Sequence, residues 1–171
     1  MNRLSGLFFC AALVLSTFPA VADSHSGDCK ASGSWYGYDE SGSIWWTSTI
    51  DGQSASRGTM TLEDPGSVNF FDGAYAITEL KGQWEKTAGN TYDWTVVGFP
   101  YDETAASLVI VKVSGTNIVG EDCDTVLITN IVMEVFPPFA NIYTDDPVAV
   151  DDSFPDHPGF RIKVDLPALL P

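Results

Sequence analysis

Basic residues are scarce in this chain of 171 residues. Lysine and arginine number 8 against 23 aspartate and glutamate residues, which gives a formal net charge of −15 at pH 7. A surface of this charge repels nucleic-acid phosphates and anionic membranes. We therefore expect no nucleic-acid partner. The acidic surface is most simply explained by solubility, and a cationic partner is the alternative.

Histidine is scarcer still, with only His25 and His157 in the chain. His157 lies between two prolines, with Ser153 and Asp156 close to it in sequence. A serine hydrolase needs its nucleophile, base and acid to converge in space, and adjacency in sequence does not supply that geometry. We therefore expect His157 to lie in a loop. No catalytic residue can be named, and we expect no cofactor.

Metal-binding patterns are also missing. Two scattered histidines do not make a zinc site. Five aspartates near the C-terminus could offer oxygen ligands to calcium, but their spacing departs from that of an EF-hand: Asp145, Asp146, Asp151, Asp152 and Asp156. We interpret this segment as a solvated acidic loop and expect no metal.

Only the N-terminus carries a long hydrophobic run. Arg3 precedes the apolar stretch from Leu7 to Leu15, and Ala20-Val21-Ala22 supplies small residues suited to signal-peptide cleavage. The run is too short for a transmembrane helix, and no later segment is apolar enough to span a bilayer. Residues 1–22 are therefore predicted to be a signal peptide and residues 23–171 one secreted or periplasmic domain.

Cysteine is rare, and one of the three falls within the predicted signal peptide. The two that remain are Cys29 and Cys123. An oxidising compartment favours their pairing. We expect one disulfide, which would anchor the N-terminal segment of the mature chain.

No long helical periodicity appears, whereas short aromatic and β-branched runs alternate with Gly, Asn, Asp and Pro throughout the chain. These runs predict seven strands: Ser34–Asp39, Ser43–Ile50, Ser56–Glu63, Ala74–Lys86, Thr91–Phe99, Leu108–Ser114 and Thr125–Phe136. Most are joined by short turns, the clearest being Thr87-Ala88-Gly89-Asn90. Closure into a barrel would remove the exposed edges of such a sheet.

An eighth strand is predicted over residues 160–166, where one face collects Phe160, Ile162, Val164 and Leu166 and the other face is charged. Residues 137–159 are rich in proline and aspartate, and we expect them to form a loop across one end of the barrel. The predicted fold is therefore all-β, a single antiparallel barrel of about eight strands. A two-sheet sandwich is the main alternative.

The segment Gly33-Ser34-Trp35-Tyr36 resembles the Gly-x-Trp opening of the lipocalins and the wider calycin superfamily. The resemblance implies a lipocalin-like barrel in which Trp35 closes one end and Arg161 packs over it. It also implies a small hydrophobic or aromatic ligand in the interior. The chain departs from the family pattern in lacking a Thr-Asp-Tyr turn in mid-chain and a helix before the final strand.

Aromatic residues are the best guide to binding, because strand alternation must send some of them into the barrel. Trp45 and Trp46 are adjacent, so a regular strand sends them to opposite faces. The candidate ligand-binding residues are Trp35, Tyr38, Trp46, Arg57, Trp84 and Trp94. Two alternatives remain open: a barrel isomerase or cyclase that uses an inward Arg57 with a carboxylate or tyrosine, and a non-catalytic interaction protein with a filled core.

Overall fold

The computed structural model describes residues 29–38, 44–63 and 71–163. The predicted signal peptide lies outside these residues. These three ranges contain no helix, and therefore no membrane-spanning helix.

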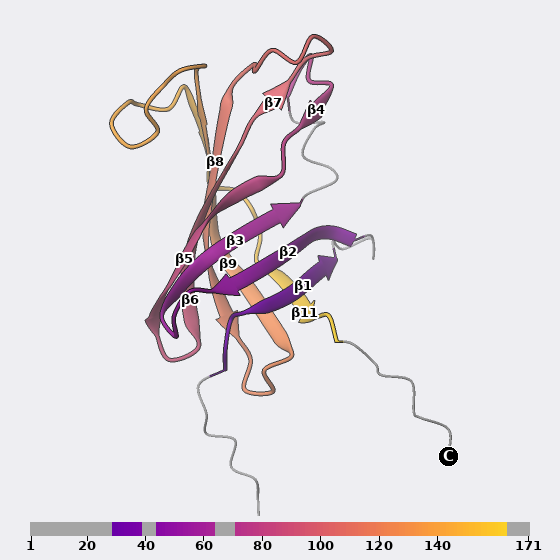
Figure 1. Cartoon of the computed structure of the whole chain (residues 1–171), viewed down its shortest axis with the longest axis vertical. Coiled ribbons are helices and arrows are strands. Elements are labelled where there is room, and N and C mark those ends of the chain that lie inside the picture. Colours follow the sequence, from indigo (N-terminus) through magenta and orange to yellow (C-terminus); the bar gives the residue numbers. More distant parts are fainter. Residues whose placement is uncertain (1–28, 39–43, 64–70, 164–171) are drawn as a thin grey trace, which may run out of the picture.

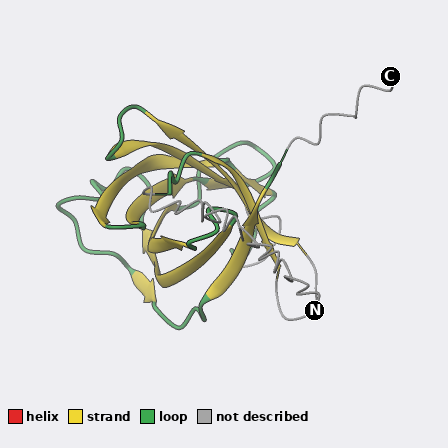
Figure 2. Cartoon of the chain, turned by 90° about the horizontal axis from the view of Figure 1, so that it is seen from below, coloured by secondary structure: helices red, strands yellow, loops and turns green. Residues whose placement is uncertain are grey.

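Eight strands form a closed antiparallel barrel (Figures 1 and 2). The order around the barrel is β1, β2, β3, β5, β6, β8, β9 and β11, and β11 pairs with β1 to close it. The strands are β1 (Gly33–Tyr38), β2 (Ile44–Gly52), β3 (Arg57–Glu63), β5 (Leu80–Ala88), β6 (Thr91–Gly98), β8 (Ile110–Val119), β9 (Thr125–Phe136) and β11 (His157–Arg161). The predicted all-β barrel is confirmed.

Three short strands lie outside this ring. β4 (Ala76–Ile77) and β7 (Pro100–Tyr101) form a small two-stranded sheet at the upper end of Figure 1. β10 (Ala149–Asp151) pairs with the second half of β9, whereas β11 pairs with the first half of the same strand. The predicted loop over residues 137–159 therefore contains β10 and the start of β11, and its first part projects away from the barrel (Figure 1).

The single strand predicted over residues 74–86 is divided into β4 and β5. Ile77 pairs with Pro100 while Lys81 pairs with Val97, so the two ladders differ in register by one residue. Between them the hydroxyl of Thr78 accepts a hydrogen bond from the Phe99 amide. Side-chain bonding of this kind competes with a regular ladder, and it interrupts the strand here.

The sixth strand was predicted over residues 108–114, and its predicted C-terminal boundary is wrong. β8 continues through Gly115 to Val119. Gly115 does not end the strand, because its missing side chain leaves room for a neighbouring ring. A Cβ atom at Gly115 would lie 2.6 Å from Cζ2 of Trp94.

The last predicted strand is wrong in both position and orientation. β11 begins at His157 rather than Phe160, and its buried residues are His157 and Gly159. Phe160 and Ile162, which the apolar pattern placed inside, are exposed. Gly159 faces the interior because the Trp46 ring occupies the space that a side chain would need.

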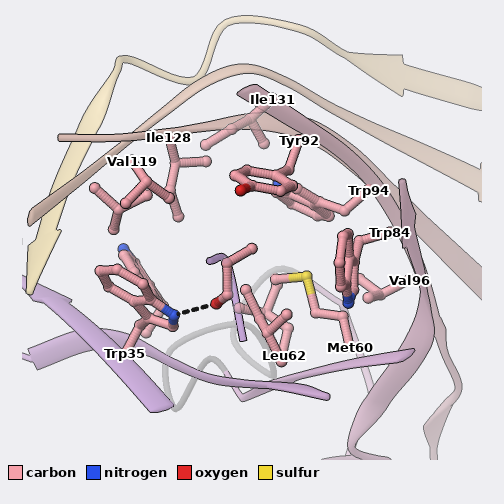
Figure 3. Packing of buried hydrophobic residues seen from close by; sticks show 14 of the residues in the cluster. Trp35, Met60, Leu62, Trp84, Tyr92, Trp94, Val96, Val119, Ile128 and Ile131 are labelled. Carbon is pink, nitrogen blue, oxygen red and sulfur yellow. Dashed lines mark hydrogen bonds between the residues drawn. The ribbon is translucent and has the colours of Figure 1, made fainter. Parts of the chain in front are cut away.

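Aromatic and aliphatic side chains from opposite walls point toward one another inside the barrel (Figure 3). Three of the interior tryptophans, Trp46, Trp84 and Trp94, lie against glycines of other strands. Gly58, Trp84, Trp94 and Gly115 form one row across β3, β5, β6 and β8. Large rings fit in adjacent strands because small residues flank them.

Residues 29–32 lie before β1 at the lower end of the barrel in Figure 1 and are bound there by Arg161 of β11. The Arg161 guanidinium carbon lies 4.2 Å from the Trp35 ring centre, and its nitrogens donate to the carbonyls of Cys123, Ser32 and Lys30. The predicted packing of Arg161 over Trp35 is confirmed. So is the Cys29–Cys123 disulfide, whose Cα atoms are 5.2 Å apart. Tyr92 also donates to the Cys29 carbonyl.

Replacing Gly115 with alanine is expected to destabilise the protein by about 1–3 kcal/mol, because the new methyl group overlaps the Trp94 ring and forces it to move. Gly52→Ala is the control, since its Cβ would lie 3.4 Å from the nearest atom. The measurement is urea unfolding followed by tryptophan fluorescence. Equal midpoints for the two variants would contradict the proposed packing.

Arg161→Met should lower the free energy of unfolding by about 2–3 kcal/mol. The variant keeps an aliphatic stem but loses three charge-assisted hydrogen bonds and the cation–π contact. Arg57→Met provides the comparison, because Arg57 is exposed, and its effect should stay within about 0.5 kcal/mol. A similar loss in both variants would show that Arg161 does not hold the end of the barrel together.

Candidate functional site

Four of the six predicted ligand-binding residues lie in the barrel core: Trp35, Trp46, Trp84 and Trp94. Each is less than a tenth exposed. Strand alternation accounts for this, because all four occupy inward positions on β1, β2, β5 and β6. The structure therefore brings these aromatic residues together inside one barrel.

Tyr38 and Arg57 are placed differently. Tyr38 ends β1, is 38% exposed and packs edge-on against Tyr36. Arg57 is exposed and pairs with Glu85 across β3 and β5, with the buried Gly58 next to it on the opposite face. The alternative of a barrel isomerase or cyclase required Arg57 to point into the barrel. Arg57 points outward, so that prediction is wrong.

Arg57 instead lines an open groove on the outer wall, with a volume of about 860 Å³. The groove crosses the outer faces of β5, β6 and β8, and Tyr143 lies at its margin. Its charged residues have both signs and include Lys112, which forms an ion pair of 2.6 Å with Glu134. Within it the hydroxyl of Thr116 donates to the Asp93 carboxylate at 2.8 Å.

The indole N–H groups distinguish Trp46 from the other interior tryptophans. Trp35 donates to the Ala31 carbonyl (2.9 Å), Trp84 to the Asp51 carbonyl (3.1 Å) and Trp94 to the Asn117 side chain (2.8 Å). Nε1 of Trp46 is buried and has no hydrogen-bond partner among the residues that the structure describes. A buried donor without a partner is rare in a native core and needs an explanation.

A second unpartnered group lies close to the first. Ser48 is 4% exposed, and within the described part of the chain its hydroxyl has no hydrogen-bond partner. It is two residues from Trp46 on the inward face of β2. In the barrel wall it lies directly between Trp35 on β1 and Leu62 on β3. Two unpartnered polar atoms therefore lie close together in a predominantly apolar interior.

His157 adds a third polar side chain to this part of the wall. It is buried on β11, two residues from Gly159, on which the Trp46 ring rests. Burial lowers the pKa of His157, and the nearby Asp156 carboxylate opposes the shift only in part. The imidazole is therefore neutral at pH 7. The buried polar residues of the described chain are Ser48, Asn117 and His157, none of which is ionised at this pH.

Sequence reasoning missed Ser48 and His157 as members of a site. Ser48 carried a usable signal, because a serine that alternates with Trp46 and Ile50 must share their inward face. His157 carried none, since the flanking prolines are typical of a loop and its burial depends on pairing with Ile128 of β9.

The stability of the folded protein should fall as the pH drops from 7.5 to 5.5. The pKa of His157 is lowered on folding, so the unfolded chain takes up a proton in this window that the folded chain resists. His157→Gln should reduce this pH dependence. Urea unfolding of both proteins at pH 7.5, 6.5 and 5.5 measures it, and parallel stability curves would contradict a buried neutral imidazole.

The comparisons with known proteins add no assignment to this geometry. No protein-family model matches the chain, no curated protein is significantly similar to it, and no solved structure matches its fold significantly.

Proposed function

We propose that this chain is an exported, lipocalin-like carrier that binds one small hydrophobic or aromatic molecule inside its barrel. The observation that carries the proposal is the pair of buried, unpartnered donors, Trp46 Nε1 and Ser48 Oγ, in a core whose other indole groups are paired. A ligand that accepts hydrogen bonds from them would supply the missing partners.

The energetics favour such an occupant. A buried donor without a partner destabilises the folded protein by about 1–3 kcal/mol. A ligand that supplies an acceptor removes this penalty, and the difference adds to the binding free energy. Each Å² of apolar surface that the ligand buries contributes about 25 cal/mol. After association costs, a modest aromatic molecule enclosed by Trp35, Trp46 and Trp94 would reach micromolar affinity.

Export is part of the same proposal. Residues 1–22 would be removed as a signal peptide, and residues 23–171 would act as a single domain in the periplasm or outside the cell. The Cys29–Cys123 disulfide is compatible with such a compartment. A disulfide that holds residues 29–32 against the end of the barrel would keep the floor of the binding site in place.

The test combines native mass spectrometry of the protein purified from its host with titration of an apolar fluorophore. We expect a co-purifying mass below about 1 kDa, and quenching of tryptophan emission when the fluorophore binds. Val113 lies on the inner face of β8 and packs against the core. Val113→Trp would place a large ring in the interior, and it should weaken binding at least tenfold. Val97→Trp is the control, because Val97 lines the outer groove.

Absence of binding to folded wild-type protein, across a panel of lipids and aromatic molecules, would contradict the carrier proposal. A non-catalytic interaction protein would then replace it. One observation favours that second candidate: four apolar side chains near the loop after β9 are highly exposed, namely Phe139, Tyr143, Val148 and Val150.

A further inference from the structure

We propose that the interior site selects an uncharged ligand with a hydrogen-bond acceptor, such as a carbonyl oxygen, which Trp46 Nε1 and the Ser48 hydroxyl bind together. This inference rests on the proposed carrier function and narrows it to one chemical class. Candidate ligands are ketones, aldehydes, esters and amides with an apolar or aromatic body.

The position of the Trp46 ring defines the first donor. A Cβ atom at Gly37 of β1 would lie 2.4 Å from Trp46 Nε1, and one at Gly159 of β11 would lie 2.5 Å from its Cζ2. The indole therefore lies across the inner face of two neighbouring strands, with its N–H group over Gly37. The two glycines pair with each other at the seam that closes the barrel.

Ser48 lies within reach of the same ligand group. Gly37 pairs with Trp46 and Trp35 pairs with Ser48, so Gly37 and Ser48 are diagonal neighbours across β1 and β2. Diagonal neighbours in an antiparallel pair are about 7–8 Å apart. One polar group seated between them can approach both donors.

The two groups also determine what the ligand must carry. An indole N–H can only donate, so its partner has to be an acceptor. A serine hydroxyl can turn to donate to the same acceptor. A pure hydrocarbon would leave Trp46 Nε1 unpaired, and we expect the site to discriminate against it.

The charge of the surroundings excludes an ionised ligand group. Among the described residues, none of the buried side chains is a lysine, arginine, aspartate or glutamate. Arg161 is the basic group nearest to Trp35, and it already binds three carbonyls and the Trp35 ring. His157 is held neutral by burial. A carboxylate or sulfonate would be desolvated here without a counter-charge, which is strongly unfavourable.

Three fluorescent probes test this selectivity on the full mature protein. 6-Propionyl-2-(dimethylamino)naphthalene is a neutral ketone, 2-(dimethylamino)naphthalene has the same ring without the carbonyl, and 1-anilinonaphthalene-8-sulfonate is anionic. We expect the ketone to bind most tightly. Ser48→Ala and Trp46→Phe should each weaken ketone binding about three- to tenfold, the effect of one net hydrogen bond, and change binding of the ring-only probe less than twofold.

Thr49→Ala is the matched control, because Thr49 is the next residue on β2 and its side chain is exposed. It should change no affinity, and circular dichroism confirms that each variant is folded. Equal affinity for the ketone and ring-only probes, or tightest binding of the sulfonate, would overturn this inference and leave the carrier function standing. Binding of molecules from the wider lipid and aromatic panel, but of none of the three probes, would overturn this inference alone. If nothing in that panel binds to folded wild-type protein, both the carrier function and this inference are overturned.

Discussion

Contact between tryptophan rings and glycine backbones is the constraint on which the rest of this barrel depends. Trp94 lies against Gly115, Trp84 against Gly58, and Trp46 against Gly37 and Gly159. At each of these positions the missing side chain of the glycine leaves the space that the ring occupies. The glycines therefore position the aromatic residues, and the aromatic residues set the size and chemistry of the interior.

The same constraint explains how the ends of the chain are joined. Gly37 and Gly159 pair at the seam between β1 and β11, and the Trp46 ring covers both of them. One position further toward the barrel floor, Arg161 packs over Trp35 and binds three carbonyl groups. The Cys29–Cys123 disulfide fixes the same region covalently. The seam that closes the barrel is thus also one wall of the candidate binding site.

Much of this architecture could be predicted from the residues alone. Alternating aromatic and β-branched runs identified most of the barrel strands, and the two-residue turn at Gly89-Asn90 lies where the sequence predicted a hairpin. Two of the errors have a common cause. At Gly115 and at Gly159 the sequence pattern was read without the rest of the sheet, and in each case a ring from another strand occupies the space beside the glycine.

The candidate site was harder to predict for a related reason. Side-chain type and alternation are local properties, and they made Trp35, Trp46, Trp84 and Trp94 candidates for the interior, where the structure places all four. Whether a buried donor finds a partner depends on the register of three or four strands, which no local pattern reveals. Arg57 lies on the outer face, and the polar groups of the interior proved to be Ser48 and His157 instead.

The central claim is that Trp46 holds a buried indole N–H group for a ligand. Nuclear magnetic resonance of ¹⁵N-labelled protein tests it directly, with the Trp46 indole signal assigned from its absence in Trp46→Phe. Adding a neutral carbonyl ligand should move the Trp46 signal downfield and protect it from solvent exchange, while the paired indole signals of Trp35 and Trp94 move little. A Trp46 signal that is unchanged at saturating ligand would contradict the account.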